Sequence, residues 1–368
     1  MTPSREGARI ALAVGAALAL GFAIMACVSD QPWAALRALL TGPLPSIERA
    51  VDGRVVVHRL VRFGAWLQDA TTLTLVGLAI AIPFRARQFS LGADGQLFMG
   101  ALAAAVVSLG VGDVPAAIAL PLAFLAAAAA GAAWGLVAGL LKTRFEANEI
   151  VTTLMLNVVA VQVYRLVVGR VLNDPTAGFI TTPPLPDAAT LAPLIARTTV
   201  TAMVLVAPAA VAAALFLLRR TTLGYEIDLA GANPWFAVRA GVPVARATVL
   251  AFALGGAFAG LAGFHVSNAL LKRLPIDLTP GIGLEGIVVA LLARGRVGAL
   301  PLAALGYAYL RVGAQAMERA TDVPREVVLV IQALIILFVV SDRLAPLALG
   351  LARRTGARVR ARIGGRAA

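Results

Sequence analysis

The chain has 368 residues, of which 60% are hydrophobic and 14% charged, and its mean hydropathy is +0.87. These values lie outside the range of soluble globular proteins and indicate an integral membrane protein. The net charge of +13 comes mostly from arginines between apolar runs, with few aromatics interleaved, so it indicates topology signals and anionic lipid rather than nucleic acid. A single cysteine, Cys27, and two histidines, His58 and His265, exclude an internal disulfide framework and argue against a metal site.

The chain begins with a basic stretch and an apolar run over residues 10–29 that resembles a secretory signal. The letters "IMAC" before Val28 also resemble a lipoprotein processing box. However, the run is long enough to cross a bilayer, and many further apolar runs follow it. We therefore expect a retained first helix.

Apolar runs recur along the whole chain, and a window of about 19 residues separates about ten of them. They predict an all-α polytopic membrane protein. Basic residues fall on alternate sides of the runs, which places both termini in the cytoplasm. The connection over residues 30–67 is expected outside although it carries five arginines, which we assign to an interfacial amphipathic helix. The predicted segments are 10–29, 68–84, 95–111, 116–141, 149–169, 199–218, 247–266, 281–293, 297–315 and 326–341.

Two of these segments carry polar motifs where a lipid-facing helix would be apolar. The third begins with "SLGADGQ", and the short eighth follows "KRLPIDLTPGIG". A pattern of glycine, acidic residue and glycine occurs in both, as "GADG" after an inward-running segment and "GLEG" after an outward-running one. This inversion predicts two five-helix halves, about 10–169 and 199–341, with broken helices at matching positions along a solute path.

The two motifs supply candidate residues for that path. Asp94 and Glu285 are carboxylates at membrane depth, which is costly without a partner or a polar cavity, and Gln96 accompanies Asp94. Glycines permit positive φ and broken helices whose exposed backbone groups can bind a polar solute. The alternative is that the glycines only permit close helix packing, and the sequence leaves both open. The glycines concerned are Gly92, Gly95, Gly283 and Gly286.

The fifth segment begins with "NEIVTTLMLN", which keeps one helix face polar for about three turns. Glu149, Thr153 and Asn157 share one row, and Asn148 and Thr152 form a neighbouring row. We expect Asn148 and Glu149, at the helix start, to act as caps. Thr152, Thr153 and Asn157 either line the path or make interhelical hydrogen bonds, and these alternatives stay open.

The longest cytoplasmic connection, residues 219–246, is polar and has the signature of short helices, with Asn233 as a candidate cap before a proline. It lies between the two predicted halves, where a cytoplasmic partner could receive a short helix in a groove. The alternative is an ordinary interfacial connector.

Five stretches, in this order and at similar spacing, resemble the membrane subunit of ATP-binding-cassette importers for nucleosides and simple sugars. The wider group includes ribose and branched-chain amino acid permeases. The resemblance covers about residues 68–342, and its first two motifs are most similar to the nucleoside-type permease that works beside a second, distinct permease. Ile227 and Asp228 depart from the family pattern, which has a small or basic residue there. The stretches are "RARQFSLGADGQLFMGA", "ANEIVTTLMLN", "YEIDLAGANPWFAVRAGVPVAR", "GIGLEGIVVALLARG" and "VPREVVLVIQALIILFVV".

The resemblance implies an importer in a bacterial plasma (inner) membrane, built from two permease chains, which we expect to form a heterodimer. Two cytoplasmic ATPase subunits and an extracytoplasmic solute-binding protein complete it. This chain would form a single permease domain over residues 1–342 with a basic cytoplasmic tail over 343–368. Six residues of the 219–246 connection are implied to contact the ATPase: Glu226, Ala230, Gly231, Asn233, Ala237 and Gly241.

No cofactor is expected on the chain itself. The ATP-binding motif G-x-x-x-x-G-K-S/T is absent, and the nearest stretch, "GLVAGLLKT", lacks a glycine before Lys142. ATP is therefore expected to be bound and hydrolysed by partner subunits, and we expect no catalytic residues in this chain. The alternative class is an ion-coupled secondary transporter with Asp94 or Glu285 as its coupling site.

Overall fold

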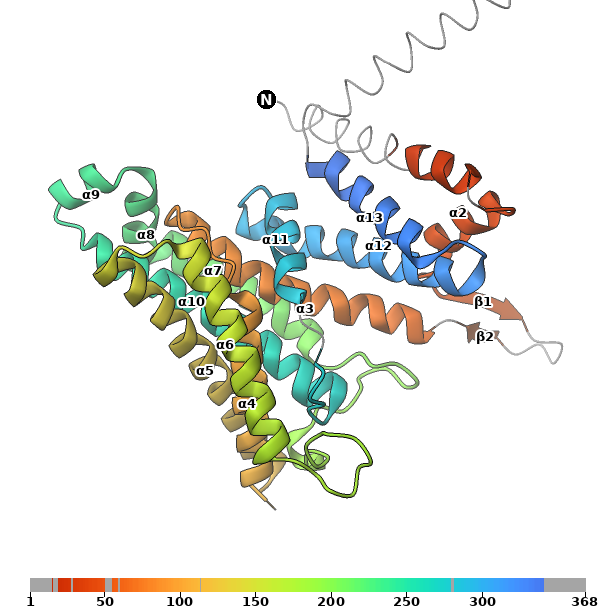
Figure 1. Ribbon diagram of the computed structural model, residues 1–368, viewed down its shortest axis with the longest axis horizontal. Helices are drawn as coiled ribbons and strands as arrows, with labels where there is room; N and C mark the ends of the chain where they lie inside the picture. Colours follow the sequence, from red (N-terminus) through yellow and green to blue (C-terminus); the bar gives the residue numbers. More distant parts are fainter. Residues whose placement is uncertain are drawn as a thin grey trace, which may run out of the picture. The chain divides into compact units, whose positions relative to one another are not determined.

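Helices dominate the described structure, with one short β-hairpin as the exception (Figure 1). The computed structural model describes residues 15, 19–27, 29–49, 55–58, 60–112, 114–278 and 281–340. The chain divides into a terminal unit, Met1–Arg59 with Tyr309–Ala368, and a central unit, Leu60–Ala308. Helix α12 (Leu300–Ala320) begins in the central unit and ends in the terminal unit.

The central unit holds the helices that matter for the site. Its short 3-10 helices are η1 (Asp187–Ala189) and η3 (Val297–Ala299), and α10 continues directly into a π-helix, η2 (His265–Leu271). The longer helices are α3 (Leu60–Arg85), α4 (Ala93–Gly110), α5 (Ala116–Phe145), α6 (Glu149–Arg170), α7 (Met203–Arg220), α8 (Thr222–Ala232), α9 (Pro234–Arg239), α10 (Val244–Phe264) and α11 (Ile282–Leu292).

Seven helices among the described residues are long and apolar enough to cross a membrane. The chain is therefore a multi-pass membrane protein. Three predicted segments are not among the seven: residues 10–29 lie largely outside the described residues, α13 (Arg325–Val340) has 16 residues, and α11 has 11. At about 1.5 Å per residue, α11 is about half as long as the hydrocarbon core is thick. The seven spans are Leu60–Arg85, Ala93–Gly110, Ala116–Phe145, Glu149–Arg170, Met203–Arg220, Val244–Leu271 and Val297–Ala320.

Helix α10 is the centre of the central unit, because it packs against α3, α4 and α5. Glycines make these contacts close. Gly131 of α5 meets Gly256 and Gly260 of α10 with so little space that a Cβ at Gly131 would lie 2.8 Å from the Cα of Gly260. A Cβ at Gly100 of α4 would also clash with Gly260, and one at Gly263 would clash with the backbone of α4. Backbone therefore touches backbone where these helices cross, as is common for helices packed in membranes.

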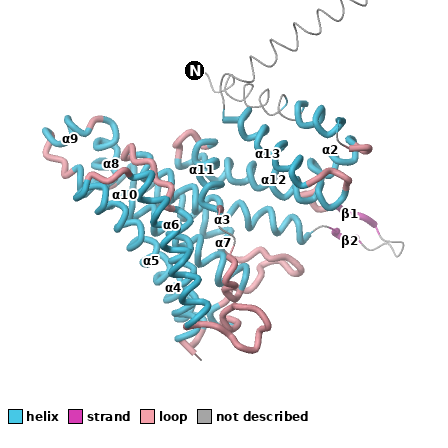
Figure 2. The backbone as a smooth tube through the Cα atoms, viewed as in Figure 1, coloured by secondary structure: helices cyan, strands magenta, loops and turns pink. Residues whose placement is uncertain are grey.

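The two ends of this bundle carry different structures. Helices α8 and α9 lie at the end where α10 begins, and the long connection between α6 and α7 lies at the end where α10 stops (Figure 2). That connection is tied to the π-helix by Asn268, whose Nδ2 donates to Ala189 O at 2.8 Å and to Ser108 Oγ of α4 at 2.7 Å. Leu191 N also donates to Asn268 O at 3.0 Å. The connection is thus a folded cap on the bundle.

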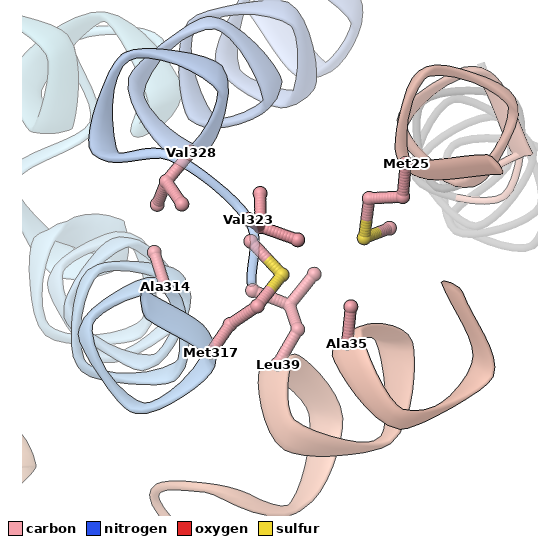
Figure 3. Close-up of a cluster of buried hydrophobic side chains, with 7 residues drawn as sticks. All are labelled: Met25, Ala35, Leu39, Ala314, Met317, Val323 and Val328. Carbon is pink, nitrogen blue, oxygen red and sulfur yellow. The ribbon is translucent and has the colours of Figure 1, made fainter. Parts of the chain in front are cut away.

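The terminal unit contains α2 (Pro32–Thr41), α13, the end of α12 and a hairpin of β1 (Ser46–Arg49) with β2 (Val55–His58). Of the five arginines expected on an interfacial amphipathic helix over residues 30–67, Arg37 lies on α2 and Arg62 lies on α3, which already begins at Leu60. Arg54 and Arg59 lie outside the described residues. Arg49 lies on an antiparallel strand, because the chain reverses there instead of continuing as a helix. Figure 3 shows how Leu39 and Met317 point toward each other inside an apolar cluster. Its buried members are Met25, Ala35, Leu39, Ala314, Met317, Val323 and Val328.

Candidate functional site

The two glycine-acid-glycine motifs stand at the N-termini of two helices, and these helix starts touch. Gly92 is the N-cap of α4, and Gly281 is the N-cap of α11. The carboxylate of Asp94, in the first turn of α4, accepts hydrogen bonds from Gly283 N at 2.7 Å and Gly281 N at 3.3 Å. The first motif therefore bonds directly to the backbone of the second, although 187 or more residues separate them.

The glycines of the two motifs allow neighbouring elements to approach the backbone closely. The sequence allows positive φ at the four motif glycines, but none of them adopts it. Gly281, which lies just before the second motif, has φ +114. A Cβ at Gly95 would lie 3.0 Å from Asn157 Cα, and one at Gly283 would lie 2.8 Å from Asp94 Cγ. The sequence could not separate these uses, since glycine is required equally for a left-handed turn and for tight packing.

The same steric requirement applies to the other two glycines. A Cβ at Gly92 would lie 3.3 Å from Thr153 Cβ, and one at Gly286 would clash with the side chain of Val76 on α3. Each of the four glycines thus faces a neighbouring element at short range.

The polar stripe of α6 holds the start of α4. Asn157 Oδ1 accepts from Gly95 N at 2.8 Å, and Asn157 Nδ2 donates to Leu91 O at 2.7 Å. Thr153 Oγ1 accepts from Leu91 N at 3.1 Å, whereas Thr152 donates only to Asn148 O of its own helix, at 2.7 Å. Thr153 and Asn157 therefore make interhelical hydrogen bonds, one of the two alternatives that the sequence left open.

The expected caps of α6 are confirmed. Asn148 is the N-cap, and its Oδ1 accepts from Ile150 N at 3.0 Å and Val151 N at 3.3 Å. Glu149 lies in the first turn and forms an ion pair with Lys142 of α5 at 2.7 Å. This contact ties the start of α6 to the end of α5.

Gln96 and Glu285 are the remaining polar candidates of the two motifs. Gln96 is 2% exposed, and its Oε1 has no hydrogen-bond partner among the described atoms. A buried amide oxygen without a partner is costly, so such a group is a candidate for binding a solute. Glu285 is half-buried in α11, near the helix N-terminus, where the macrodipole favours an acidic side chain.

The connection over residues 219–246 contains two helices, α8 and α9. Asn233 caps α9, as expected, by accepting from Phe236 N at 3.1 Å. Ala230, Gly231 and Ala237 are buried, and a Cβ at Gly231 would clash with the backbone carbonyl of Arg85. These three residues therefore pack α8 and α9 onto the bundle. Of the other candidates, Glu226 is half-buried, and Gly241 is exposed with φ +79.

The exposed apolar residues of α9 were missed from the sequence. Trp235 is 83% exposed, Val238 61% and Phe236 57%. The available signal was the occurrence of large apolar side chains within a polar connection. The departures from the family pattern also have a structural explanation: Ile227 is fully buried and Asp228 forms an ion pair with Arg85 at 2.9 Å.

Among the described residues, no group of three or more His, Cys, Asp or Glu side chains could hold a metal ion. The site thus consists of helix starts joined by hydrogen bonds inside a multi-pass bundle, and α9 exposes three large apolar side chains. Short helices that begin inside a bundle are typical of membrane transport proteins. This arrangement indicates that the protein is a membrane transport subunit.

The family follows from comparison with known proteins. Residues 63–340 match the family described as "Branched-chain amino acid transport system / permease component", so the chain belongs to this family. It is 36% identical to a glucose ABC transporter permease protein of Haloferax volcanii, over 83% of this chain and 85% of that protein. It is 34% identical to a guanosine ABC transporter permease protein of Bacillus subtilis, over 80% and 85%. A nucleoside ABC transporter permease protein of Lactococcus lactis is 27% identical, over 75% and 78%. No solved structure matches the chain significantly.

The chain is therefore the permease subunit of an ATP-binding-cassette importer and a multi-pass plasma-membrane protein. It works with ATPase subunits and a solute-binding protein, and ATP hydrolysis takes place in the ATPase subunits. The family favours this class over the ion-coupled secondary transporter that the sequence left as an alternative.

Proposed function

We propose that the chain carries a nucleoside or a simple sugar across the plasma membrane. The proposal is supported by relatives named for glucose, guanosine and nucleosides. One feature of the site agrees with an uncharged, hydroxyl-rich solute. Gln96 offers a buried amide with an unpaired oxygen, whereas Asp94 Oδ1 is already bonded by two backbone amides. The amide oxygen can accept a hydrogen bond from a hydroxyl group of such a solute.

The solute path is proposed to pass the joined starts of α4 and α11. Gln96 and Glu285 would face it, and Asp94 would shape it together with the polar stripe of α6, Thr152, Thr153 and Asn157. The glycines of the two motifs, Gly92, Gly95, Gly283 and Gly286, would bring the helices close enough to form its wall. The measurement that tests this is uptake of labelled guanosine and glucose by vesicles holding the complete transporter.

Uptake and chain abundance should be determined together for Gln96→Ala and Glu285→Gln. Loss of one hydrogen bond to a neutral solute costs about 0.5–1.5 kcal/mol, so apparent affinity should fall roughly two- to tenfold for Gln96→Ala. Leu205→Ala, on the exposed face of α7, is the matched control and should change nothing. Wild-type affinity at normal abundance in both pathway variants would remove these side chains from the path.

The topology proposed is ten spans in two inverted halves, 10–169 and 199–341, within one permease domain over residues 1–342. Both termini and the basic tail, 343–368, would be cytoplasmic. A reporter fused after Arg220 should then be cytoplasmic, and one inserted near Pro183 should be extracytoplasmic. A cytoplasmic reporter near Pro183 would contradict the ten-span arrangement and the inverted halves together.

The partner arrangement proposed is a heterodimer with a second permease, with α8 and α9 contacting the ATPase through the predicted residues Glu226, Ala230, Gly231, Asn233, Ala237 and Gly241. Since Gly231 and Ala237 are buried, bulky replacements there would disturb folding as well as docking.

Trp235→Ala changes only an exposed side chain. If α9 docks on the ATPase, this variant should lower transport-linked ATP hydrolysis roughly tenfold, as expected for an interface anchor. Normal coupled hydrolysis in Trp235→Ala would place the contact elsewhere.

A further inference from the structure

Helix α11 begins inside the central unit without a capping side chain of its own. The first N–H groups of a helix have no partner within the helix and must be satisfied by other groups. The N-cap of α11 is Gly281, which has no side chain, and the flanking Gly283 is buried. In an apolar bundle, unsatisfied backbone donors are costly. The cap of α11 must therefore come from another part of the chain.

Asp94 supplies this cap from α4. Its Oδ1 accepts from Gly283 N at 2.7 Å and Gly281 N at 3.3 Å, and the residue is only 8% exposed. Because Asp94 also lies in the first turn of α4, the positive ends of two helix dipoles meet at one carboxylate. Glycine is required at position 283, since a Cβ there would lie 2.7 Å from Asp94 N.

The segment that carries Asp94 is itself held in place. Asn157 bonds Leu91 O and Gly95 N, and Thr153 bonds Leu91 N, so the turn before α4 is fixed to α6. A continuous series of hydrogen bonds thus runs from α6 through the start of α4 to the start of α11. Its last step is formed by the two bonds to Asp94 Oδ1.

We propose that Asp94 is a positioning residue, which caps α11 from α4 and holds that helix in place for transport. Transport then requires the hydrogen-bond acceptor at this position and does not require the negative charge. Asparagine is as good an N-cap acceptor as aspartate and has the same shape, whereas alanine offers no acceptor. If Asp94 instead bound a proton or a cation during transport, the variant Asp94→Asn would not transport.

The position of α11 can be followed without any solute. Val289 is fully buried in α11, so a cysteine placed there reacts with N-ethylmaleimide only when the helix moves. The background carries Cys27→Ser, which removes the only native cysteine, and Val289→Cys. Alkylation should be about tenfold faster with Asp94→Ala than with native Asp94, and unchanged with Asp94→Asn. Asp277→Ala, which removes an exposed acid before α11, is the matched control and should also leave the rate unchanged.

Uptake of labelled guanosine and glucose gives the second measurement, which rests on the proposed function, whereas alkylation does not. Asp94→Asn should accumulate normally, protect the cysteine and retain at least half of native uptake. The proposal is overturned if Asp94→Asn fails to accumulate, if it exposes the cysteine, or if it loses uptake while the cysteine stays protected. Unchanged alkylation in Asp94→Ala would also overturn it. If native protein carries neither solute but the alkylation pattern holds, only the solute assignment fails.

Discussion

Replacing Asn157 with alanine should destabilise the central unit by breaking the contact between α6 and the start of α4. The side chain makes two hydrogen bonds to backbone, with Gly95 N at 2.8 Å and Leu91 O at 2.7 Å. Alanine removes both, and it leaves a donor and an acceptor of the α4 start without their partner. The matched control is Thr152→Ala, because that hydroxyl bonds only the Asn148 carbonyl of its own helix.

The expected loss follows from these two bonds. A hydrogen bond contributes about 0.5–1.5 kcal/mol net, and leaving a buried group unsatisfied costs about 1–3 kcal/mol. Side-chain hydrogen bonds in membrane proteins average only about 0.6 kcal/mol, since the unfolded chain in a membrane also finds partners. Two bonds therefore correspond to about 1–4 kcal/mol of unfolding free energy for Asn157→Ala. Thr152→Ala should cost less than about 0.5 kcal/mol, as expected for a self-bonded helix hydroxyl.

Unfolding free energies can be measured by titrating the purified chain in mixed micelles with sodium dodecyl sulfate. Helix content by circular dichroism reports the transition, and the two variants are compared with native protein at the same lipid ratio. If Asn157→Ala proves as stable as Thr152→Ala, the interhelical bonds of α6 do not stabilise the α4 start, and the reasoning is refuted.

Three further substitutions test other contacts. Gly260→Leu should prevent accumulation of folded chain in membranes, because the new side chain would clash with the carbonyl of Ala127. Normal abundance on immunoblots would contradict the close crossing of α5 and α10. Asp228→Ala should lower unfolding free energy by less than about 1 kcal/mol in the same titration, since its pair with Arg85 is partly exposed, and a larger loss would show a more buried pair. Gly281→Ala should lower the unfolding free energy by about 1–3 kcal/mol in the same titration, because an L-residue is strained at φ +114. An unchanged unfolding free energy would refute that backbone conformation.

Much of the architecture is predictable from composition and hydrophobic runs alone. Continuous apolar runs predicted the long helices, and the short eighth run corresponds to the 11-residue α11. Cap chemistry predicted Asn148 and Asn233 correctly, because an N-cap bonds residues two or three positions along the chain. The hairpin of β1 and β2 was missed, since its short strands lie in a stretch whose arginines suggested an amphipathic helix.

The site was predictable only as a set of residues. The repeated motif indicated that Asp94 and the "GLEG" stretch belong together, and the structure brings them into contact through Gly281 and Gly283. The sequence could not show that the carboxylate bonds backbone, because a partner 187 or more residues away leaves no local signal. The glycines of α5 were also missed, although Gly131 and Gly135 have the spacing of small residues at a helix crossing.

The glycine crossing between α5 and α10 also restricts how the bundle can move. At Gly131, Gly256 and Gly260 the two backbones are in contact, so sliding either helix by one residue would bring a side chain into a space that holds none. Packed cores of this kind switch between discrete arrangements and do not deform continuously. We therefore expect the α5–α10 pair to move as one rigid piece during each transport cycle.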